Sequence, residues 1–435
     1  MGTRDINYAI VKGAFLPKWL LMSVYFCVSI YRKLILSFLK HINPLITGIF
    51  FLVWSMNAYF LFGNIGRHAA IFIGFILILL SALIAPNKKG SAGFFLATLL
   101  VYLIYLALPI LQNHQTLSSI NLIFGLVCFT LLNAGYILGK NFKMYKVLPD
   151  LMIYIYSILT IAGSFYFIRY QSYSLILGRS FGFEDESVGA IGIAYTHSIL
   201  ILYFLALVFI KKHNISVKIL IIFSIFALIG VILTTQSRGA IIFLSSIFLI
   251  LAYKGIQVRK KTIKVLFNFI FIIAALIISI NLIQNQYPII ADQINQTVNR
   301  FQRLTLSGTG AINDRSALAR AEMYNAFFND IGSYIIVGKQ DYRPYPHNQF
   351  LEIVLRWGII FGLPLILLSV HTLYKALKYI APSHYSSNTV VIMIISTFLF
   401  SYFQSMTSLS LEMNRMLWLG FGFVYSYQVG HELHE

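Results

Sequence analysis

Apolar runs long enough to cross a lipid bilayer recur along almost the whole chain. A transmembrane helix needs about 20 such residues, and helices span lipid because they satisfy their own backbone hydrogen bonds. Only 11% of the residues are charged and 58% are hydrophobic, whereas a soluble domain is about a quarter charged. The sequence therefore predicts an all-α polytopic membrane protein with about 12 transmembrane helices and a large, partly helical extracytoplasmic loop.

The apolar runs divide the chain into four parts. An N-terminal segment covers 1–42, nine spans lie within 43–284, a loop covers 285–350, and three spans with a short tail occupy 351–435. The twelve predicted spans lie near 43–64, 68–85, 91–111, 118–138, 147–168, 188–211, 216–235, 239–254, 264–284, 351–374, 388–407 and 412–428.

Residues 15–39 are apolar but carry Lys18, Arg32 and Lys33. This mixture predicts an amphipathic helix that lies in the membrane interface. A first transmembrane span in the same residues is the alternative. A cleaved signal peptide is not expected, because no small-residue cleavage site follows a clean apolar core.

The basic residues in the connections between spans set the expected orientation. Fifteen lysines and arginines fall in five alternate connections, and five arginines fall in the opposite short ones. Those five are Arg67, Arg169, Arg179, Arg238 and Arg415. Cytoplasmic connections carry the excess of positive charge, so we expect both termini in the cytoplasm and loop 285–350 outside. The net charge of +19 then reflects topology and an affinity for anionic lipid or an anionic lipid-linked substrate, not a nucleic-acid partner.

No metal or cofactor is expected. Cys27 and Cys128 lie inside apolar runs, which predicts neither a disulfide framework nor a metal site. The long loop has no pair of carboxylates at ligand spacing, and the run 307–310 (Ser-Gly-Thr-Gly) lacks the lysine of a phosphate-binding P-loop.

Residues 285–362 form the only long polar interval of the chain. Loops of this length are usually functional or disordered, and the tyrosines and phenylalanines throughout this one argue against disorder. We therefore expect the chemistry here and on the neighbouring connections of the same outer side.

Arg238 lies in the short turn 234–240 between two apolar helices, on the side that is poor in positive charge. A charge at such a place is a functional candidate. The alternative is an arginine that only anchors the helix end by reaching to the interface.

A second candidate is the segment 313–328, whose apolar residues have the spacing of an amphipathic helix. Asp314 and Ser316 are possible caps at its start. Arg320 lies in this predicted helix, and its spacing does not decide whether it faces the fold or solvent.

His347 is the third candidate, between Pro346 and Asn348 at the entry to the next apolar helix. Glu352 and Arg356 follow at the spacing of a helical ion pair. A histidine exchanges a proton near neutral pH, although a structural role is the alternative. Two arginine forks suit a diphosphate, and a histidine supplies a base that activates a hydroxyl.

These motifs resemble the O-antigen ligase and polymerase family of bacterial membrane glycosyltransferases. The turn at 237–240 (Ser-Arg-Gly-Ala), the Arg320 segment, and Pro346-His347-Asn348 followed by 356–362 are similar to that family's arginine and histidine motifs. The segment around Arg179, Gly178 to Gly182, is similar to a further periplasmic loop. The resemblance covers about residues 175–365.

The resemblance implies metal-independent transfer of a glycan from undecaprenyl diphosphate at the periplasmic face of the bacterial cytoplasmic membrane. It makes His347 the base and Arg238 and Arg320 the catalytic arginines that bind the diphosphate. Arg315 competes with Arg320 for the second role, and Asn348 and Arg179 join the expected substrate-binding set.

A ligase would transfer the glycan to lipid A-core, in lipopolysaccharide biosynthesis, and we expect this activity first. A polymerase would use a lipid-linked glycan as acceptor and has the same motifs. A transporter or flippase of lipid-linked sugars is an alternative of another class, with His197 and His371 as the ionisable groups inside spans.

Overall fold

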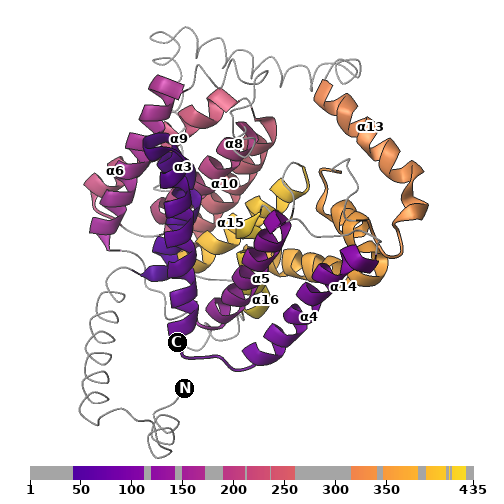
Figure 1. Cartoon of the computed structure of the whole chain (residues 1–435). Helices are drawn as coiled ribbons and strands as arrows, with labels where there is room; N and C mark the ends of the chain where they lie inside the picture. The colour runs from indigo at the N-terminus through magenta and orange to yellow at the C-terminus, as the bar shows by residue number, and fades with distance from the viewer. Residues whose placement is uncertain are drawn as a thin grey trace, which may run out of the picture. The chain divides into compact units, whose positions relative to one another are not determined.

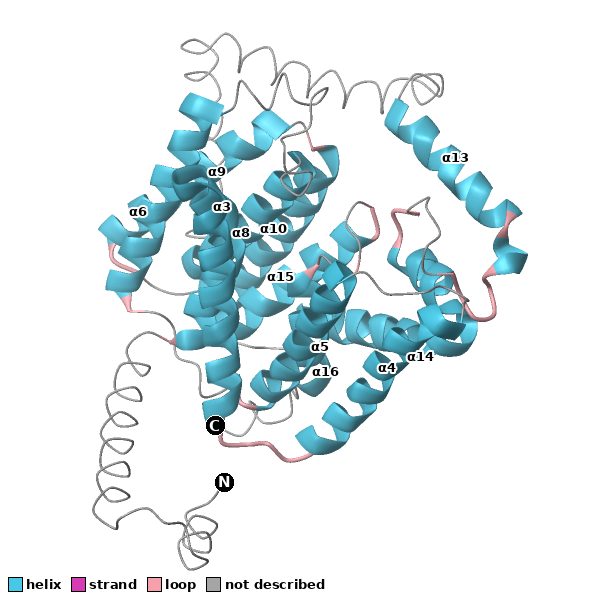
Figure 2. Cartoon of the chain, in the orientation of Figure 1, coloured by secondary structure: helices cyan, strands magenta, loops and turns pink. Residues whose placement is uncertain are grey.

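The computed structural model describes residues 43–111, 119–142, 149–171, 190–210, 213–235, 237–259, 315–339, 346–380, 388–407, 411 and 414–427. Within these ranges the regular structure is helical and contains no strand (Figure 2). Among the described residues, six helices are long and apolar enough to cross a membrane. The protein is thus an all-α polytopic membrane protein, as predicted.

The helices are labelled in Figure 1. They are α3 (Pro44–Ile84), α4 (Ser91–Leu111), α5 (Ser119–Lys140), α6 (Asp150–Tyr166) with the π-helix η2 (Phe167–Gln171), α8 (Ala190–Ile210), α9 (Ile215–Thr235), α10 (Arg238–Arg259), α13 (Arg315–Asn329), the 3-10 turn η5 (Ile331–Ser333), α14 (Gln349–Ile380), α15 (Thr389–Ser405) and α16 (Arg415–Ser426).

Eleven of the twelve predicted spans coincide with these helices. The span at 264–284, the segment 1–42 and loop residues 285–314 lie outside the described residues. That all twelve spans cross a membrane stays a prediction.

Helix α3 contains two of the predicted spans, because it folds back at Gly63. This glycine has φ 66° and ψ −159°, a combination that only glycine adopts readily. A Cβ on Gly48 would lie 2.8 Å from the carbonyl oxygen of Gly74, although a straight helix would hold these residues about 39 Å apart. The halves 44–62 and 64–84 are therefore packed antiparallel, each about 30 Å long.

Helix α14 corrects the prediction of one continuous span at 351–374. It is broken at Gly358, which has φ 64° and ψ −178°. Residues 349–357 form a short helix of about 14 Å that folds back on the rest: a Cβ on Gly362 would lie 2.7 Å from Cγ2 of Ile353. Only 359–380 has the length of a membrane span.

Helix α8 is the centre of the bundle. Every side chain from His197 to Val208 is buried, and α8 packs on α3, α9, α10 and α15. An apolar helix with no polar face is stable in such a position because neighbours cover it on all sides.

Helices α5 and α16 approach so closely that glycines separate them. A Cβ on Gly135 would lie 2.1 Å from the carbonyl oxygen of Leu419, and one on Gly139 would lie 2.2 Å from Oγ of Ser426. Small residues four apart allow this kind of packing in membranes. The later glycine of α5 meets a later residue of α16, so the two helices run parallel.

The helix ends gather at two faces. The Arg238 face includes the starts of α8 and α10, the end of α15 and the start of α14. The Lys140 face includes the start of α4 and the ends of α5 and α16; there Asn141 exchanges two hydrogen bonds with the backbone of Asn87, at 2.9 and 2.8 Å. These groupings are the ones that the predicted alternation of spans requires.

Candidate active site

Arg238 is the first residue of α10, directly after the turn that ends α9. The hydroxyls of Thr234 and Thr235 donate to carbonyls three residues earlier, at 2.7 and 2.6 Å, and both side chains are buried. The half-buried Arg238 thus combines its own charge with the positive end of a helix dipole, an arrangement that favours anions.

His347 has a left-handed backbone, with φ 47°. Such a value is uncommon outside glycine and occurs more readily at Asn, Asp and His. The histidine is half-buried and follows a buried proline, Pro346. Unusual backbone conformations of this kind cluster at functional sites, because the surrounding structure must stabilise them.

Asn348 caps α14. Its side-chain oxygen accepts hydrogen bonds from the backbone N–H groups of Phe350 and Leu351, at 3.0 and 3.3 Å. Asparagine is among the best residues for this position. The Asn348 side-chain oxygen therefore stabilises the start of the helix, and its substrate-binding role stays a prediction.

A series of contacts, partly buried, connects the Arg238 turn with the His347 turn. Gly239 packs against Tyr195, whose hydroxyl would lie 2.6 Å from a Cβ at that position. Tyr195 Oη lies 3.4 Å from Thr407 Oγ1. Two residues earlier, Ser405 donates to Gln349 Oε1 at 2.6 Å, and Gln349 is two residues from His347.

Gln349 also anchors the short helix to the rest of α14. Its amide nitrogen donates to Ser369 Oγ at 3.0 Å, and Ser369 donates to Tyr402 Oη at 3.2 Å. All three side chains are buried. The role of Gln349 was not predictable from the sequence, because its partners lie 20 and 56 residues away and a lone glutamine carries no signal for them.

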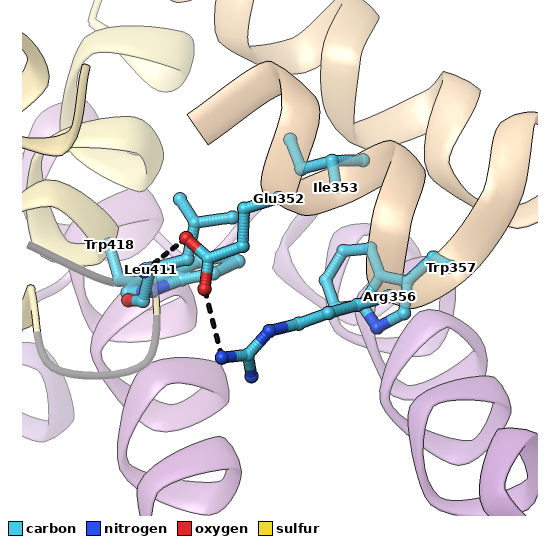
Figure 3. A pocket seen from close by; sticks show the side chains of 6 residues that line it. All are labelled: Glu352, Ile353, Arg356, Trp357, Leu411 and Trp418. Atoms are coloured by element: carbon cyan, nitrogen blue, oxygen red, sulfur yellow. Dashed lines mark hydrogen bonds and ion pairs between the residues drawn. The ribbon is translucent and has the colours of Figure 1, made fainter. Parts of the chain in front are cut away.

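Glu352 and Arg356 form the ion pair that their spacing predicted, at 3.1 Å. Glu352 is fully buried and also accepts from the backbone N–H of Leu411 at 3.1 Å, as Figure 3 shows. Leu411 in turn accepts from Trp418 Nε1 at 2.7 Å. A small cavity lies between these groups, Ile353 and Trp357. The carboxylate therefore holds the connection between α15 and α16 against the short helix.

Helix α13 confirms the helix predicted at 313–328, but it begins at Arg315. Ser316 therefore lies inside its first turn, and Asp314 lies outside the described residues. Phe327 and Tyr334 pack with Leu355 of α14, and the Tyr334 hydroxyl donates to the carbonyl oxygen of Phe327. These contacts are at the C-terminal end of α13.

The segment after η5 is joined to α14 at its break. Lys339 N–H donates to Leu355 O at 2.6 Å, and the N–H groups of Ile359 and Ile360 donate to Ile335 O and Ile336 O at 2.7 and 3.3 Å. A broken helix leaves backbone groups without their usual partners, and segment 335–339 supplies them. The arm formed by α13 and residues 330–339 is thereby tied to the helix that follows His347.

For three expected site residues, the structure describes no contact with the Arg238 turn or the His347 turn. Arg315 and Arg320 lie on α13, in the half of the helix away from the Phe327 contact. Arg179 lies outside the described residues. Among the described residues, no group of histidine, cysteine, aspartate and glutamate side chains has the arrangement of a metal site.

His197 and His371, the residues relevant to a transporter, do not meet. His197 is fully buried in α8, and its Nδ1 donates to Ile193 O at 2.8 Å. His371 lies against the ring of Tyr425, with centroids 5.8 Å apart, on the exposed side of α14.

The geometry thus brings one expected arginine and the expected histidine to one face, with a partly buried series of contacts between their turns. No known family model matches this chain, and no curated protein matches it significantly.

Proposed function

We propose that the protein is a membrane glycosyltransferase of the O-antigen ligase type, which transfers a glycan from undecaprenyl diphosphate to lipid A-core. The observation that carries the proposal is the series of contacts through Tyr195, Thr407, Ser405 and Gln349, between the Arg238 turn and the His347 turn. These contacts support a site in which the permanent charge of Arg238 and the imidazole of His347 lie on the same face of the protein.

In the proposed reaction, His347 accepts the proton of the acceptor hydroxyl while that oxygen attacks the anomeric carbon of the glycan. The bond from this carbon to the diphosphate oxygen breaks, and its electron pair leaves with undecaprenyl diphosphate. Arg238 neutralises the charge that develops on the leaving group. The proton on the imidazole then passes to water.

A second arginine comes from α13 in this proposal. Arg320 or Arg315 supplies a second contact to the diphosphate, and the arm that carries both is hydrogen-bonded to α14 at 355–360. The joint through Lys339 and Ile359 thus makes the position of α13 depend on the helix that begins beside His347.

The proposed site is periplasmic, with both termini in the cytoplasm. This orientation rests on the fifteen-to-five distribution of basic residues. Single cysteines at Ser237 and Ser307 are expected to react with an impermeant thiol reagent added to intact spheroplasts, and one at Thr262 is not. Labelling at residue 262 alone would reverse the orientation.

The activity is tested with purified protein in detergent, a labelled undecaprenyl-diphosphate glycan and two acceptors offered separately. Glycosylated lipid A-core supports a ligase. Lengthened lipid-linked glycan with unchanged lipid A-core supports the polymerase. A transporter forms no product without a membrane, so absence of both products, together with uptake in proteoliposomes, would replace the proposal.

A further inference from the structure

On the Lys140 face, away from the proposed active site, two lysines lie over an aromatic cluster. Lys140 Nζ lies 4.8 Å from the ring centroid of Tyr136, and Lys375 Nζ lies 5.8 Å from that of Tyr425. The two tyrosine rings are 6.2 Å apart, and Phe94 stacks on both, at 4.0 and 5.5 Å. We call these five residues the lysine–tyrosine cluster; they come from α4, α5, α14 and α16.

Both ammonium groups are held in place by backbone carbonyls. Lys140 donates to Lys89 O at 2.5 Å, and Lys375 donates to Tyr425 O at 2.6 Å. A lysine has three N–H donors, so each keeps donors for a further acceptor. The lysines are thus positioned by the fold, unlike lysines that extend freely into solvent.

The positive charge of the cluster is not balanced by the acidic side chains that the structure places. Within the described part of the chain, Asp150 pairs with His213 and Glu352 with Arg356. The other two, Glu322 and Asp330, belong to the α13 arm. Half-buried cations with only dipolar partners favour an external anion, because burial without a counter-charge is costly.

The surroundings of the cluster identify the kind of anion. Two of the helices that contribute to it also carry exposed apolar side chains near it in sequence: Leu96, 63% exposed on α4, and Tyr374, 64% exposed on α14. Tyrosine and lysine side chains concentrate at the level of lipid headgroups. An anion at this place therefore has apolar surface beside it that acyl chains can cover.

We propose that the lysine–tyrosine cluster is a binding site for the phosphate headgroup of an anionic phospholipid. Lys140 and Lys375 contact the phosphate, and the exposed apolar side chains of α4 and α14 contact the acyl chains. Basic pockets between transmembrane helices bind anionic lipid headgroups in this way. The site is independent of the proposed transferase activity.

The test is a titration of the purified full chain in neutral detergent with phosphatidylglycerol, cardiolipin or the neutral phosphatidylcholine, followed by native mass spectrometry. We expect the anionic lipids to bind and phosphatidylcholine not to. Each lysine near a membrane surface is worth about fivefold in affinity, so Lys140→Gln with Lys375→Gln should weaken binding about 25-fold. Lys140→Arg with Lys375→Arg should retain it.

Lys218→Gln is the matched control, because it removes the same charge from the start of α9, at a different helix pair. Its affinity for phosphatidylglycerol should equal that of the wild-type chain. Anionic lipid should also raise the thermal midpoint of the wild-type and Lys218→Gln proteins, but not that of the double glutamine variant. If that variant does not fold, each single variant should show the fivefold loss.

Three results would overturn the proposal. The first is equal binding of phosphatidylcholine, and the second is an unchanged affinity in the double glutamine variant. The third is displacement of lipid by an equal concentration of glycerol phosphate, which would mean a site for free phosphate.

Discussion

Helices α3 and α14 break at glycines with nearly the same backbone conformation, and the results differ. Gly63 has φ 66° and ψ −159°, and Gly358 has φ 64° and ψ −178°. In α3 the break separates two halves of membrane length. In α14 it separates one such half from a short helix that begins beside His347.

The surroundings of the two glycines explain the difference. A Cβ at Gly63 would meet no atom within 4 Å, whereas one at Gly358 would lie 2.2 Å from the carbonyl oxygen of Ile336. The break in α3 makes a turn and nothing more. The break in α14 is covered by another segment, which supplies hydrogen bonds to its backbone. We infer that the same backbone conformation reverses the chain between two spans in α3, and positions the short helix beside His347 in α14.

The largest loss of transfer activity is expected on substitution of His347. This residue precedes the short helix of α14, and α3 has no such short helix. His347→Asn keeps a residue that tolerates the left-handed backbone but removes the base, so transfer should fall by about 10² to 10⁴. Binding of the undecaprenyl-diphosphate glycan should persist, because arginines hold the diphosphate. The measurement is the initial rate per folded protein. A rate within about threefold of wild type would contradict a general base.

The pH dependence of the wild-type rate tests the same residue. A general base must be neutral to accept a proton, so the rate should fall as the pH is lowered and the imidazole takes up a proton. His347→Asn should lose this limb of the profile along with its rate. An identical acid limb in the variant would assign the titration to another group.

The next effect is expected at the arginines. Arg238→Lys keeps the charge but loses the planar fork that binds a diphosphate with two hydrogen bonds, so most activity should be lost while expression is retained. Arg169→Lys is the control, because Arg169 is exposed and lies over the ring of Tyr170 at 5.5 Å. Normal transfer by Arg238→Lys would favour a simple anchoring role.

The same substitution distinguishes the two arginines of α13. If Arg320 is the second diphosphate ligand, Arg320→Lys should lose most activity and Arg315→Lys should lose little. The reverse pattern would move the role to Arg315. Donor binding measured alongside transfer separates a lost contact from a misplaced α13 arm, because the arm is joined to α14 beyond both residues.

Gly358→Ala tests whether the break in α14 depends on the covering segment. The backbone strain alone is worth about 1 to 3 kcal/mol, and the Cβ would also displace the backbone of Ile336. Overpacking of this kind adds about 1 to 3 kcal/mol. We expect a lower thermal midpoint in detergent and a loss of transfer as the short helix moves. An unchanged midpoint would mean that segment 335–339 does not cover the break.

The helices were predictable from sequence and the break in α14 was not, for one physical reason. Hydropathy reports burial in lipid or protein, and residues 351–374 are mostly apolar on both sides of Gly358. A glycine within such a run is compatible with close packing, as at Gly135, or with a break, as at Gly358. The distinction depends on segment 335–339, which is distant in sequence.

Local spacing predicted those features of the site that lie within one helix. The Glu352–Arg356 pair and the start of α14 beside Asn348 follow from neighbours four residues apart or fewer. The contacts of Gln349, and the approach of Leu411 to Glu352, depend on how helices pack. The candidate Arg238 was found because it is a charge in a short connection on the side poor in positive charge, and His347 because it lies at the end of the long polar interval.

The smallest effect is expected at Gly63. Gly63→Ala meets no neighbouring atom, so only the backbone strain of about 1 to 3 kcal/mol remains, and transfer per folded protein should be unchanged. Gly93→Ala is the matched control: it too has open space, but it lies in the first turn of α4 with helical geometry, where alanine stabilises by about 0.5 to 1 kcal/mol. The two variants should therefore shift the thermal midpoint in opposite directions. If Gly63→Ala instead lowers stability as much as Gly358→Ala, the strain of the backbone alone accounts for both breaks, and the covering of Gly358 by Ile336 has no energetic role.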